Sequence, residues 1–369
     1  MIYLDNNATT QPLPEVVEAV ASVMRDTWGN PSSPFAIGKS ARRILEESRH
    51  SIAGFFTARD HRLVFTSGAT ESIRTVANCL LPKEKFVFTN VEHSVVFAAS
   101  RCLPSDRVNV IPVDADGQPD WGELEKVLGQ GPALVTVTTG NNETGILVDL
   151  RMAVLVCSKY RARLHLDATQ AVSRIDVSSL LDACDFLTAS AHKFHGPRGC
   201  GLLFVREGTR FSPMFPGTQE GGWRAGTENL PAIAGTAAAL QSQCDWSDMA
   251  DKMKANRKAL ESSMLRHLPS AEIHGMNQPR LPNTTSIYIP GCDAATIVQS
   301  AASCDLILSA GSACSNSGRP SHVILAMGHS KKRAAATLRL SLSRNTTPEE
   351  VESATALIVK LISESPRVA

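Results

Sequence analysis

Residues 163–170, Arg163-Leu164-His165-Leu166-Asp167-Ala168-Thr169-Gln170, place a polar turn directly after a short apolar strand. Other stretches of strand length, separated by helical patterns, occur at 62–66, 85–89, 133–137, 185–189 and 201–205. Short apolar strands that alternate with helices are typical of a mostly parallel sheet with helices on both faces. The sequence therefore predicts an α/β fold that binds its ligand beyond the carboxyl ends of the strands.

The two ends of the chain carry different patterns. Apolar residues at three-to-four spacing predict helices over 16–24 and 41–55. A helical pattern over 230–267 is long enough to link two domains. A second, smaller α+β domain is then predicted by strand patterns at 283–289, 306–309 and 337–342 and by a helical pattern at 349–364.

The composition excludes several classes of partner. The 37 Lys and Arg against 36 Asp and Glu leave a net charge of +1 over 369 residues, too little to bind nucleic acid or an anionic membrane through bulk charge. The first residues lack the basic and apolar regions of a signal peptide, and no apolar stretch reaches the roughly 18 residues of a membrane span. We expect a cytoplasmic protein that binds neither nucleic acid nor membrane.

Nine cysteines are scattered over the chain, at positions 79, 102, 157, 184, 200, 244, 292, 304 and 314. The number is odd, and no C-x-x-C pair or His/Cys cluster occurs. The pattern predicts neither a disulfide framework nor a zinc site, so we expect no metal. Most of the cysteines are expected to be buried thiols.

Two polar clusters follow predicted strands directly. Thr66-Ser67-Gly68-Ala69-Thr70-Glu71 is a small-residue turn whose backbone N–H groups suit a phosphate, although most such turns only start a helix. Asp167 is a carboxylate just beyond a strand, with no obvious cationic neighbour in the sequence. It could cap a helix or hold a proton on a heteroaromatic nitrogen, and the residues alone leave both interpretations open.

Two further clusters offer nucleophiles. Lys193 lies in the compact turn 190–197, and a lysine partly removed from water has a lowered pKa and can form a Schiff base. Cys314 lies in the small and polar stretch 309–320, which favours an exposed, mobile and reactive thiol. The alternatives are a solvated surface lysine and a structural cysteine.

The order of these clusters resembles that of the cysteine desulfurase and selenocysteine lyase family, which are fold-type I enzymes that depend on pyridoxal 5′-phosphate (PLP). The resemblance extends over nearly the whole chain, in segments 3–10, 29–33, 66–71, 92–93, 141–145, 167–170, 190–193, 224–229, 311–314 and 338–341. It implies a PLP-dependent transferase fold, with a mostly parallel seven-stranded sheet in a large domain at 12–250. Residues 1–11 and 251–369 would form a smaller α+β domain that carries the Cys314 loop.

The resemblance also implies roles around the cofactor ring. Lys193 would bind PLP covalently and act in catalysis. Asp167 would pair with the ring nitrogen and keep it protonated, so that the ring can accept electrons from the substrate carbon. His93 would stack on the ring as a second catalytic residue, and Gln170 would hydrogen-bond the phenolic oxygen.

Two other groups of residues receive roles from the same resemblance. The 5′-phosphate would be bound by Ala69, Thr70, Ser190 and His192, with Thr227 reaching in from the other subunit of a homodimer. The substrate carboxylate would be bound by Asn142 and by Arg339, whose guanidinium can hold it as a bidentate fork.

The implied reaction converts L-cysteine into L-alanine and leaves a persulfide on Cys314 for an acceptor protein. The acceptor could be an iron–sulfur scaffold, a tRNA-modifying enzyme or part of a selenophosphate pathway, and the sequence does not identify it. The loop between Cys314 and Pro320 is shorter than in many desulfurases, which bears on how far a persulfide could travel, and Ser72-Ile73-Arg74 also departs from the family pattern.

Three alternatives stay open. Phe35 stands where many desulfurases have histidine, which favours a lyase acting on L-selenocysteine. A PLP aminotransferase or epimerase on the same fold would need no thiol. A non-catalytic scaffold that binds a sulfur acceptor would be expected to lack Lys193 or Asp167.

Overall fold

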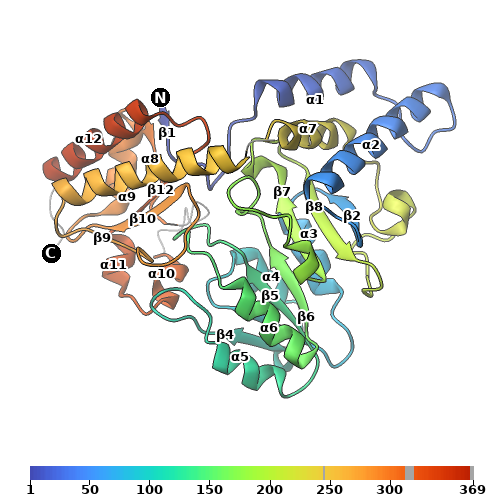
Figure 1. The fold of residues 1–369 in the computed structure, drawn as a ribbon, viewed down its shortest axis with the longest axis horizontal. Coiled ribbons are helices and arrows are strands. Elements are labelled where there is room, and N and C mark those ends of the chain that lie inside the picture. The colour runs from blue at the N-terminus through green and yellow to red at the C-terminus, as the bar shows by residue number, and fades with distance from the viewer. Residues whose placement is uncertain (244–245, 312–319, 366–369) are drawn as a thin grey trace.

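The computed structural model describes residues 1–243, 246–311 and 320–365. Its centre is a seven-stranded sheet (Figure 1). The strands, in spatial order, are β2 (His61–Thr66), β8 (Gly201–Arg206), β7 (Phe186–Ser190), β6 (Arg163–Asp167), β5 (Ala133–Thr138), β3 (Lys85–Thr89) and β4 (Val108–Ile111). Only β8 runs antiparallel to its neighbours, so the mostly parallel sheet is confirmed.

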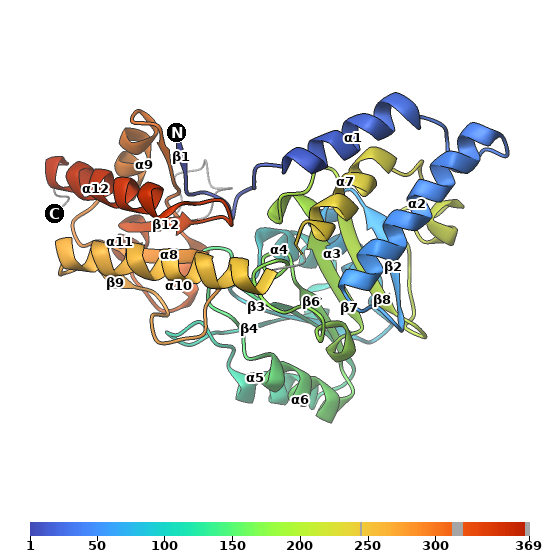
Figure 2. The same ribbon diagram turned by 45° about the horizontal axis from the view of Figure 1, so that its top comes forward.

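Helices cover both faces of this sheet because its strands are apolar on both sides. Five helices pack on one face, where they share a single apolar core with the sheet: α1 (Pro14–Asp26), α2 (Ala36–Phe55), α5 (Trp121–Leu128), α6 (Leu150–Tyr160) and α7 (Leu230–Gln241). The other face packs against α3 (Ala69–Asn78) and α4 (Ser94–Ser100). Figure 2 shows α1, α2 and α7 side by side at one end of the molecule.

A second unit contains two small sheets. One is antiparallel, with the order β12 (Thr337–Ser341), β10 (Thr284–Tyr288) and β9 (Glu272–Ile273), and the other pairs β1 (Ile2–Tyr3) with β11 (Leu306–Ile307). The helices of this part are α8 (Trp246–His267), α9 (Ala294–Ala302), α10 (His322–Ala326), α11 (Lys331–Ala335) and α12 (Pro348–Glu364). Its apolar core is separate from that of the large sheet.

These separate cores support the division into a domain at 12–250 and a domain formed by 1–11 and 251–369, which stays a prediction. The boundary at residue 250 falls inside α8. The first ten residues connect the two parts, because β1 belongs to the small sheets while the backbone N–H of Thr10 donates to the carbonyl oxygen of His192 beside the large sheet.

The prediction of one continuous helix over 230–267 is wrong. The helical pattern is divided between α7 and α8, and Ser242 and Gln243 are not helical. Both residues make other contacts there. The Ser242 carbonyl accepts a hydrogen bond from Arg344 Nη1, and the buried Gln243 side chain donates to the Phe194 carbonyl oxygen. Tertiary hydrogen bonds therefore replace helical ones at this point.

Seven of the cysteines lie in the described ranges, and all seven are free. Four of them, Cys79, Cys157, Cys184 and Cys200, are buried. No helix within the described ranges is both long and apolar enough to cross a bilayer.

Candidate active site

Asp167 ends strand β6 and is almost completely buried. Its Oδ1 atom accepts three hydrogen bonds, from Thr169 N at 3.0 Å, Thr169 Oγ1 at 2.5 Å and Thr188 Oγ1 at 3.2 Å. Among the residues that the structure describes, none donates to Oδ2. One oxygen is therefore fixed by the protein, and the other is left to accept a proton-bearing group such as a pyridinium nitrogen.

Lys193 ends the short 3₁₀ turn Ala191–Lys193 that follows strand β7. Its Nζ atom donates to the carbonyl oxygens of Asn7 at 2.6 Å and Ala8 at 2.8 Å. The N-terminal segment thus holds the lysine amine beside the large sheet, close to where β6 and β7 end.

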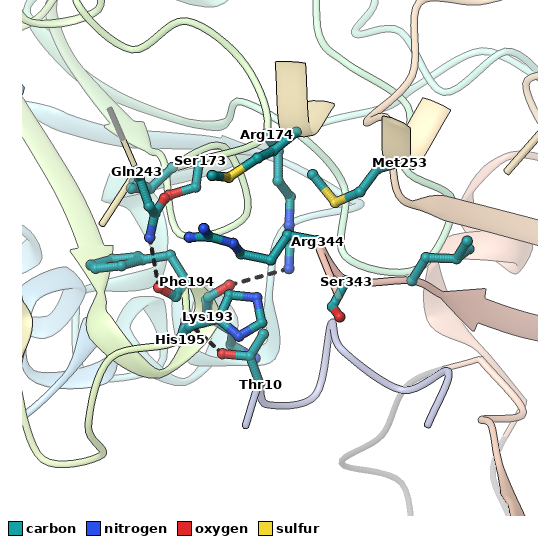
Figure 3. A pocket seen from close by; sticks show the side chains of 13 residues that line it. Thr10, Ser173, Arg174, Lys193, Phe194, His195, Gln243, Met253, Ser343 and Arg344 are labelled. Carbon is teal, nitrogen blue, oxygen red and sulfur yellow. Dashed lines mark hydrogen bonds between the residues drawn. The ribbon is translucent and has the colours of Figure 1, made fainter. Parts of the chain in front are cut away.

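The Lys193 turn is also clamped from its far side (Figure 3). Arg174 Nη2 donates to the Lys193 carbonyl oxygen at 3.3 Å, and the backbone N–H of His195 donates to Thr10 Oγ1 at 2.7 Å. Burial lowers the pKa of Arg174 to about 9, so its guanidinium is still protonated at neutral pH. These contacts explain why a lysine can occupy a fixed position in a short turn.

His93 caps the N-terminus of α4, where its Nδ1 atom accepts from the backbone N–H of Val95 at 3.3 Å. Burial lowers the pKa of His93, and the charge of Asp167 raises it while that of Lys193 lowers it further. The imidazole is therefore neutral at pH 7 and lies within electrostatic reach of both residues. The structure brings together His93, Asp167 and Lys193, as the sequence predicts.

Gln170 lies beside the lysine amine. Its Nε2 atom donates to the Asn7 carbonyl oxygen at 3.0 Å, the same oxygen that accepts from Lys193 Nζ. Arg174 Nη1 donates to Gln170 Oε1, so the orientation of the amide is fixed with its N–H groups toward the lysine side. An amide donor in this place suits an anionic oxygen next to the lysine.

The turn before α3 has the features of a phosphate site. The first backbone N–H groups of α3, at Ala69 and Thr70, have no intrahelical partner, and Gly68 before them has no side chain that could cap them. Strand β8 approaches this turn closely, since a Cβ atom on Gly201 would lie 2.5 Å from the Gly68 carbonyl carbon. Ser190 is paired with Gly201 across the sheet, and its Oγ atom faces Gly68.

The other two predicted phosphate ligands are placed differently. His192 is adjacent to Lys193, and its Nδ1 atom lies 3.1 Å from Thr9 Oγ1. Burial lowers the pKa of His192 to about 4, with a further contribution from Lys193, so the ring is neutral at pH 7. Thr227 is exposed, and no hydrogen bond to a described residue holds its side chain. Its segment is tied to α3 through Arg224 Nε, which lies 2.9 Å from Glu71 Oε1.

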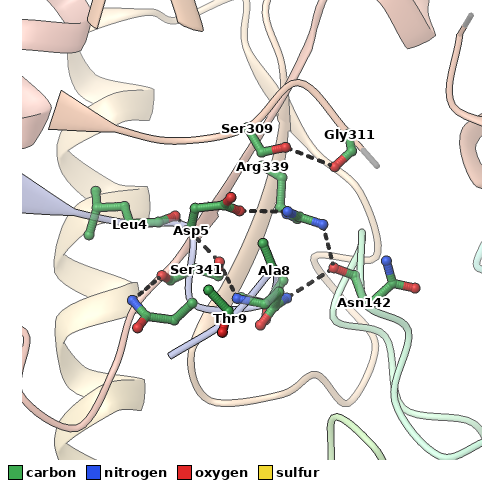
Figure 4. Close-up of polar contacts among 12 residues, drawn as sticks. Leu4, Asp5, Ala8, Thr9, Asn142, Ser309, Gly311, Arg339 and Ser341 are labelled. Atoms are coloured by element: carbon green, nitrogen blue, oxygen red, sulfur yellow. Dashed lines mark hydrogen bonds and ion pairs between the residues drawn. The ribbon is translucent and has the colours of Figure 1, made fainter. Parts of the chain in front are cut away.

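Arg339 and Asn142 meet between the two parts of the molecule (Figure 4). Arg339 lies in β12 with a side chain 1% exposed, and its Nη1 atom donates to the Asn142 carbonyl oxygen at 3.2 Å. Its Nη2 atom is 2.6 Å from Asp5 Oδ1, and its buried Nε atom has no hydrogen-bond partner among the described residues. The guanidinium is therefore anchored at one end and retains a free donor.

Cys314 lies outside the described residues. Of its neighbours in sequence, Gly311 and Ser321 are described; Ser321 contacts Glu143, and Gly311 lies near it. Ser321 Oγ donates to Glu143 Oε2 at 2.5 Å, and a Cβ atom on Gly311 would lie 3.4 Å from the same oxygen. Glu143 belongs to segment 141–145, the same segment as Asn142.

Several residues of the site did not emerge from the sequence. Thr188 and Thr169 hold Asp167, the carbonyl of Asn7 holds Lys193, and Asp5 holds Arg339. The alternation of apolar and polar residues along 163–167 and 186–190 is a signal that could have identified the polar face near Asp167. Backbone carbonyls leave no such signal, because every residue has one.

Comparison with known proteins identifies the family. The aminotransferase class-V model matches residues 2–353. Cysteine desulfurases from Trichormus azollae and Enterobacter agglomerans are 36% and 38% identical to this chain, over 98% and 95% of it and over 93% and 90% of their own lengths. The chain thus aligns with these relatives nearly end to end.

Solved structures agree. A NifS-like protein from Rickettsia africae superposes with a TM-score of 0.90 at 31% identity, over 98% of this chain and 99% of its own. The protein SspA, solved in complex with cysteine, gives a TM-score of 0.79 at 25% identity, over 94% of this chain and 100% of its own. Members of the class-V family are typically PLP-dependent. The chain therefore belongs to the aminotransferase class-V family, with cysteine desulfurases among its relatives.

Proposed function

We propose that the protein is a PLP-dependent cysteine desulfurase, which removes sulfur from L-cysteine to give L-alanine and receives the sulfur as a persulfide on Cys314. The observation that carries the proposal is that Asp167 and Lys193 follow two adjacent strands of the sheet and that the charges of both act on the pKa of His93. The chain shares its fold with cysteine desulfurases. In such a fold PLP requires an amine for its aldehyde, a carboxylate for its ring nitrogen and a ring to stack on, and Lys193, Asp167 and His93 could supply them.

The described residues fit the cofactor at three separate points. Oδ2 of Asp167 is available for the ring nitrogen, since Oδ1 already has three donors. The free N–H groups at the start of α3 and the hydroxyl of Ser190 suit the phosphate. The third point is Lys193, whose amine shares the Asn7 carbonyl oxygen with the amide of Gln170. When bound, PLP would supply an electron sink for negative charge at the substrate carbon.

The remaining steps follow from the chemistry of the chain's own residues. Arg339 and Asn142 would bind the substrate carboxylate, and the free Nε atom of Arg339 is a donor available for it. The Lys193 amine, once displaced by the substrate, would take a proton from the α-carbon. Neutral His93 can accept a proton from the substrate thiol.

Sulfur transfer would then involve Cys314. Its thiolate attacks the substrate sulfur, the bond between that sulfur and Cβ breaks, and the electron pair of the broken bond goes to Cβ. Protonation of Cβ and return of a proton from the Lys193 amine to the α-carbon would complete L-alanine, and Cys314 would carry one additional sulfur. No external oxidant or reductant is needed for this half-reaction. A thiol or an acceptor protein, whose identity we leave open, would remove the sulfur afterwards.

A homodimer is part of the proposal. The assignment of Thr227 to the phosphate of a second subunit is consistent with its exposure in the single chain. Arg224 ties the same segment to α3 through Glu71, which places the segment near the proposed phosphate turn.

Selenocysteine lyase activity is the second candidate, and Phe35 favours it. This aromatic side chain directly precedes α2 and is 72% exposed. The fold and the cofactor residues are the same for both substrates, so only substrate preference separates the two functions.

Paired assays of the purified, PLP-loaded protein test the proposal. With L-cysteine and a reducing thiol, we expect L-alanine and sulfide in equal amounts. L-selenocysteine would be tested in parallel, and a preference of a hundredfold or more for it would change the assignment to selenocysteine lyase. Transamination without sulfide release would instead indicate an aminotransferase.

A further inference from the structure

Three side chains lie beneath Asp167 on the sheet face that packs against α3 and α4. His165 precedes Asp167 by two residues in β6 and so shares its face. Thr136 is its cross-strand neighbour in β5, and Thr188 is the neighbour of Asp167 in β7. All three side chains are completely buried, within a layer that is otherwise mostly apolar. A buried polar cluster in such a layer needs hydrogen bonds among its own members.

The hydrogen bonds form one continuous chain. Thr136 Oγ1 lies 3.2 Å from His165 Nδ1, and His165 Nε2 lies 3.2 Å from Thr188 Oγ1. Thr188 Oγ1 in turn donates to Asp167 Oδ1 at 3.2 Å. The cluster therefore leads directly to the carboxylate that we assign to the ring nitrogen of the cofactor.

The direction of every bond in this chain can be deduced. A carboxylate oxygen can only accept, so the single hydroxyl proton of Thr188 points to Asp167. The Thr188 oxygen must then accept from His165, which makes Nε2 the protonated nitrogen. Burial lowers the pKa of His165 to about 4, so at neutral pH the ring has only this one N–H. Its Nδ1 atom accepts from the hydroxyl of Thr136.

We propose that His165 is a positioning residue for the cofactor, because its Nε2–H group fixes the hydroxyl of Thr188 so that it donates to Asp167 Oδ1. This inference rests on the proposed function, which assigns Asp167 to the ring nitrogen. Without the imidazole donor, the hydroxyl of Thr188 is free to turn away. Asp167 would then keep only the donors of Thr169, and both of its oxygens could rotate with respect to the ring.

A histidine is suited to this position because it is long enough to span from β5 to β7. A purely space-filling role makes a different prediction. In that case an apolar ring of similar size would serve as well, and the effects of replacing His165 and Thr188 would be independent of each other.

The first experiment measures the tautomer of His165 directly, by ¹⁵N NMR of histidine-labelled protein without and with PLP. We expect the Nε2–H form alone from pH 5.5 to pH 8.5 in both samples. A protonated Nδ1, or titration of the ring within this range, would overturn the proposal. The measurement on the PLP-free protein does not depend on the proposed function.

The second experiment measures PLP affinity and the ¹⁵N shift of ring-labelled PLP in variants of the chain. In His165→Phe and in Thr188→Val we expect PLP to bind at least about tenfold more weakly, with the same shift of the ring nitrogen signal. The double variant should lose no more than either single variant. Thr188→Ser and His165→Gln, which retain the donors, should recover most of the affinity and the wild-type shift.

Thr136→Val is the matched control, since it removes a hydroxyl from the same imidazole on the side away from Asp167. Its ring nitrogen shift should equal that of the wild type.

Additive losses in the double variant, or an unchanged shift in Thr188→Val, would refute the positioning role while leaving PLP binding intact. Failure of the wild type to bind PLP would instead refute the proposed function. If His165→Phe does not fold, the positioning role is tested by comparing the PLP affinity and the ring nitrogen shift of Thr188→Val with those of Thr188→Ser.

Discussion

Asp5 and the buried Arg339 form an ion pair with 2.6 Å between Asp5 Oδ1 and Arg339 Nη2, although the two residues are 334 positions apart in the sequence. The pair lies where the N-terminal segment crosses β12, and Asn142 receives a second hydrogen bond from the same guanidinium. Arg339 is thus held by an ion pair, while the donor at its Nε atom is not used by the described residues. Steady-state kinetics can therefore separate a structural role of Arg339 from a role in substrate binding.

We expect Arg339→Lys to raise KM for L-cysteine far more than it lowers PLP content. A lysine retains the charge and can remain paired with Asp5, but it loses the planar fork that holds a carboxylate through two bonds. Steady-state kinetics and cofactor absorbance check this prediction. Arg333→Lys is the matched control, because Arg333 pairs with Glu272 in the same part of the chain. An unchanged KM with lower stability would assign Arg339 a structural role only.

Lys193→Ala should lose all turnover together with the covalent attachment of PLP. The replaced amine is the one held by the carbonyl oxygens of Asn7 and Ala8 next to Asp167. Borohydride reduction followed by peptide mapping measures the attachment. Lys159→Ala, which removes an exposed lysine paired with Glu125, should behave as the wild type. Covalent cofactor in Lys193→Ala after reduction would contradict the assignment.

The backbone of the large sheet was largely predictable from the sequence. Six strands lie within one residue of their predicted bounds, because apolar runs of strand length between helices identify the buried strands of such a sheet. Strand β4 did not emerge from this reasoning. It is short, lies at the sheet edge and leaves Val110 46% exposed, so its sequence lacks the continuous apolar character of a central strand.

The predictable part of the site consists of side chains that follow strands. Asp167 and Lys193 could be predicted because charged residues that directly follow apolar strands lie where open α/β sheets bind their ligands. Asp5 and the carbonyl of Asn7 could not be found in the same way. Their roles depend on how the N-terminal segment passes between the two parts of the molecule, and local sequence does not encode that path.

Glu92 should make the stability of the protein depend on pH. Burial raises the pKa of Glu92 to about 8, and no residue in the described part of the chain forms a hydrogen bond with Oε2 of its carboxyl group. In the unfolded chain the group loses its proton near pH 4.3, so between that pH and about 8 unfolding releases a proton. The free energy of unfolding then falls with rising pH by up to about 1.4 kcal/mol per pH unit from this group, and levels off above pH 8.

Glu92→Gln removes this dependence. Its melting temperature should exceed that of the wild type by a margin that grows from pH 5.5 to pH 8 and is constant above it. Glu352→Gln, at an exposed position of α12, serves as the control and should show no such trend. A margin that stays constant from pH 5.5 to pH 8 would show that Glu92 is already ionised in the folded protein.

Cys314→Ala should still load PLP and still change the cofactor spectrum when L-cysteine is added, because the thiol is not part of the proposed cofactor contacts. Formation of L-alanine from L-cysteine should fall by orders of magnitude. A selenol is more acidic than a thiol, so residual selenide release from L-selenocysteine would favour a lyase that accepts both substrates. Cys304→Ala, which removes an exposed cysteine ten residues earlier in the chain, is the control and should retain full activity.

The most direct test of the central claim follows labelled sulfur. The PLP-loaded protein is treated with ³⁴S-labelled L-cysteine in the absence of reductant, alkylated, and mapped by mass spectrometry while L-alanine is quantified. The proposed function predicts one ³⁴S atom attached to Cys314 for each molecule of L-alanine formed in the first turnover. Label on another cysteine with Cys314 unmodified, or no L-alanine at all, would contradict it.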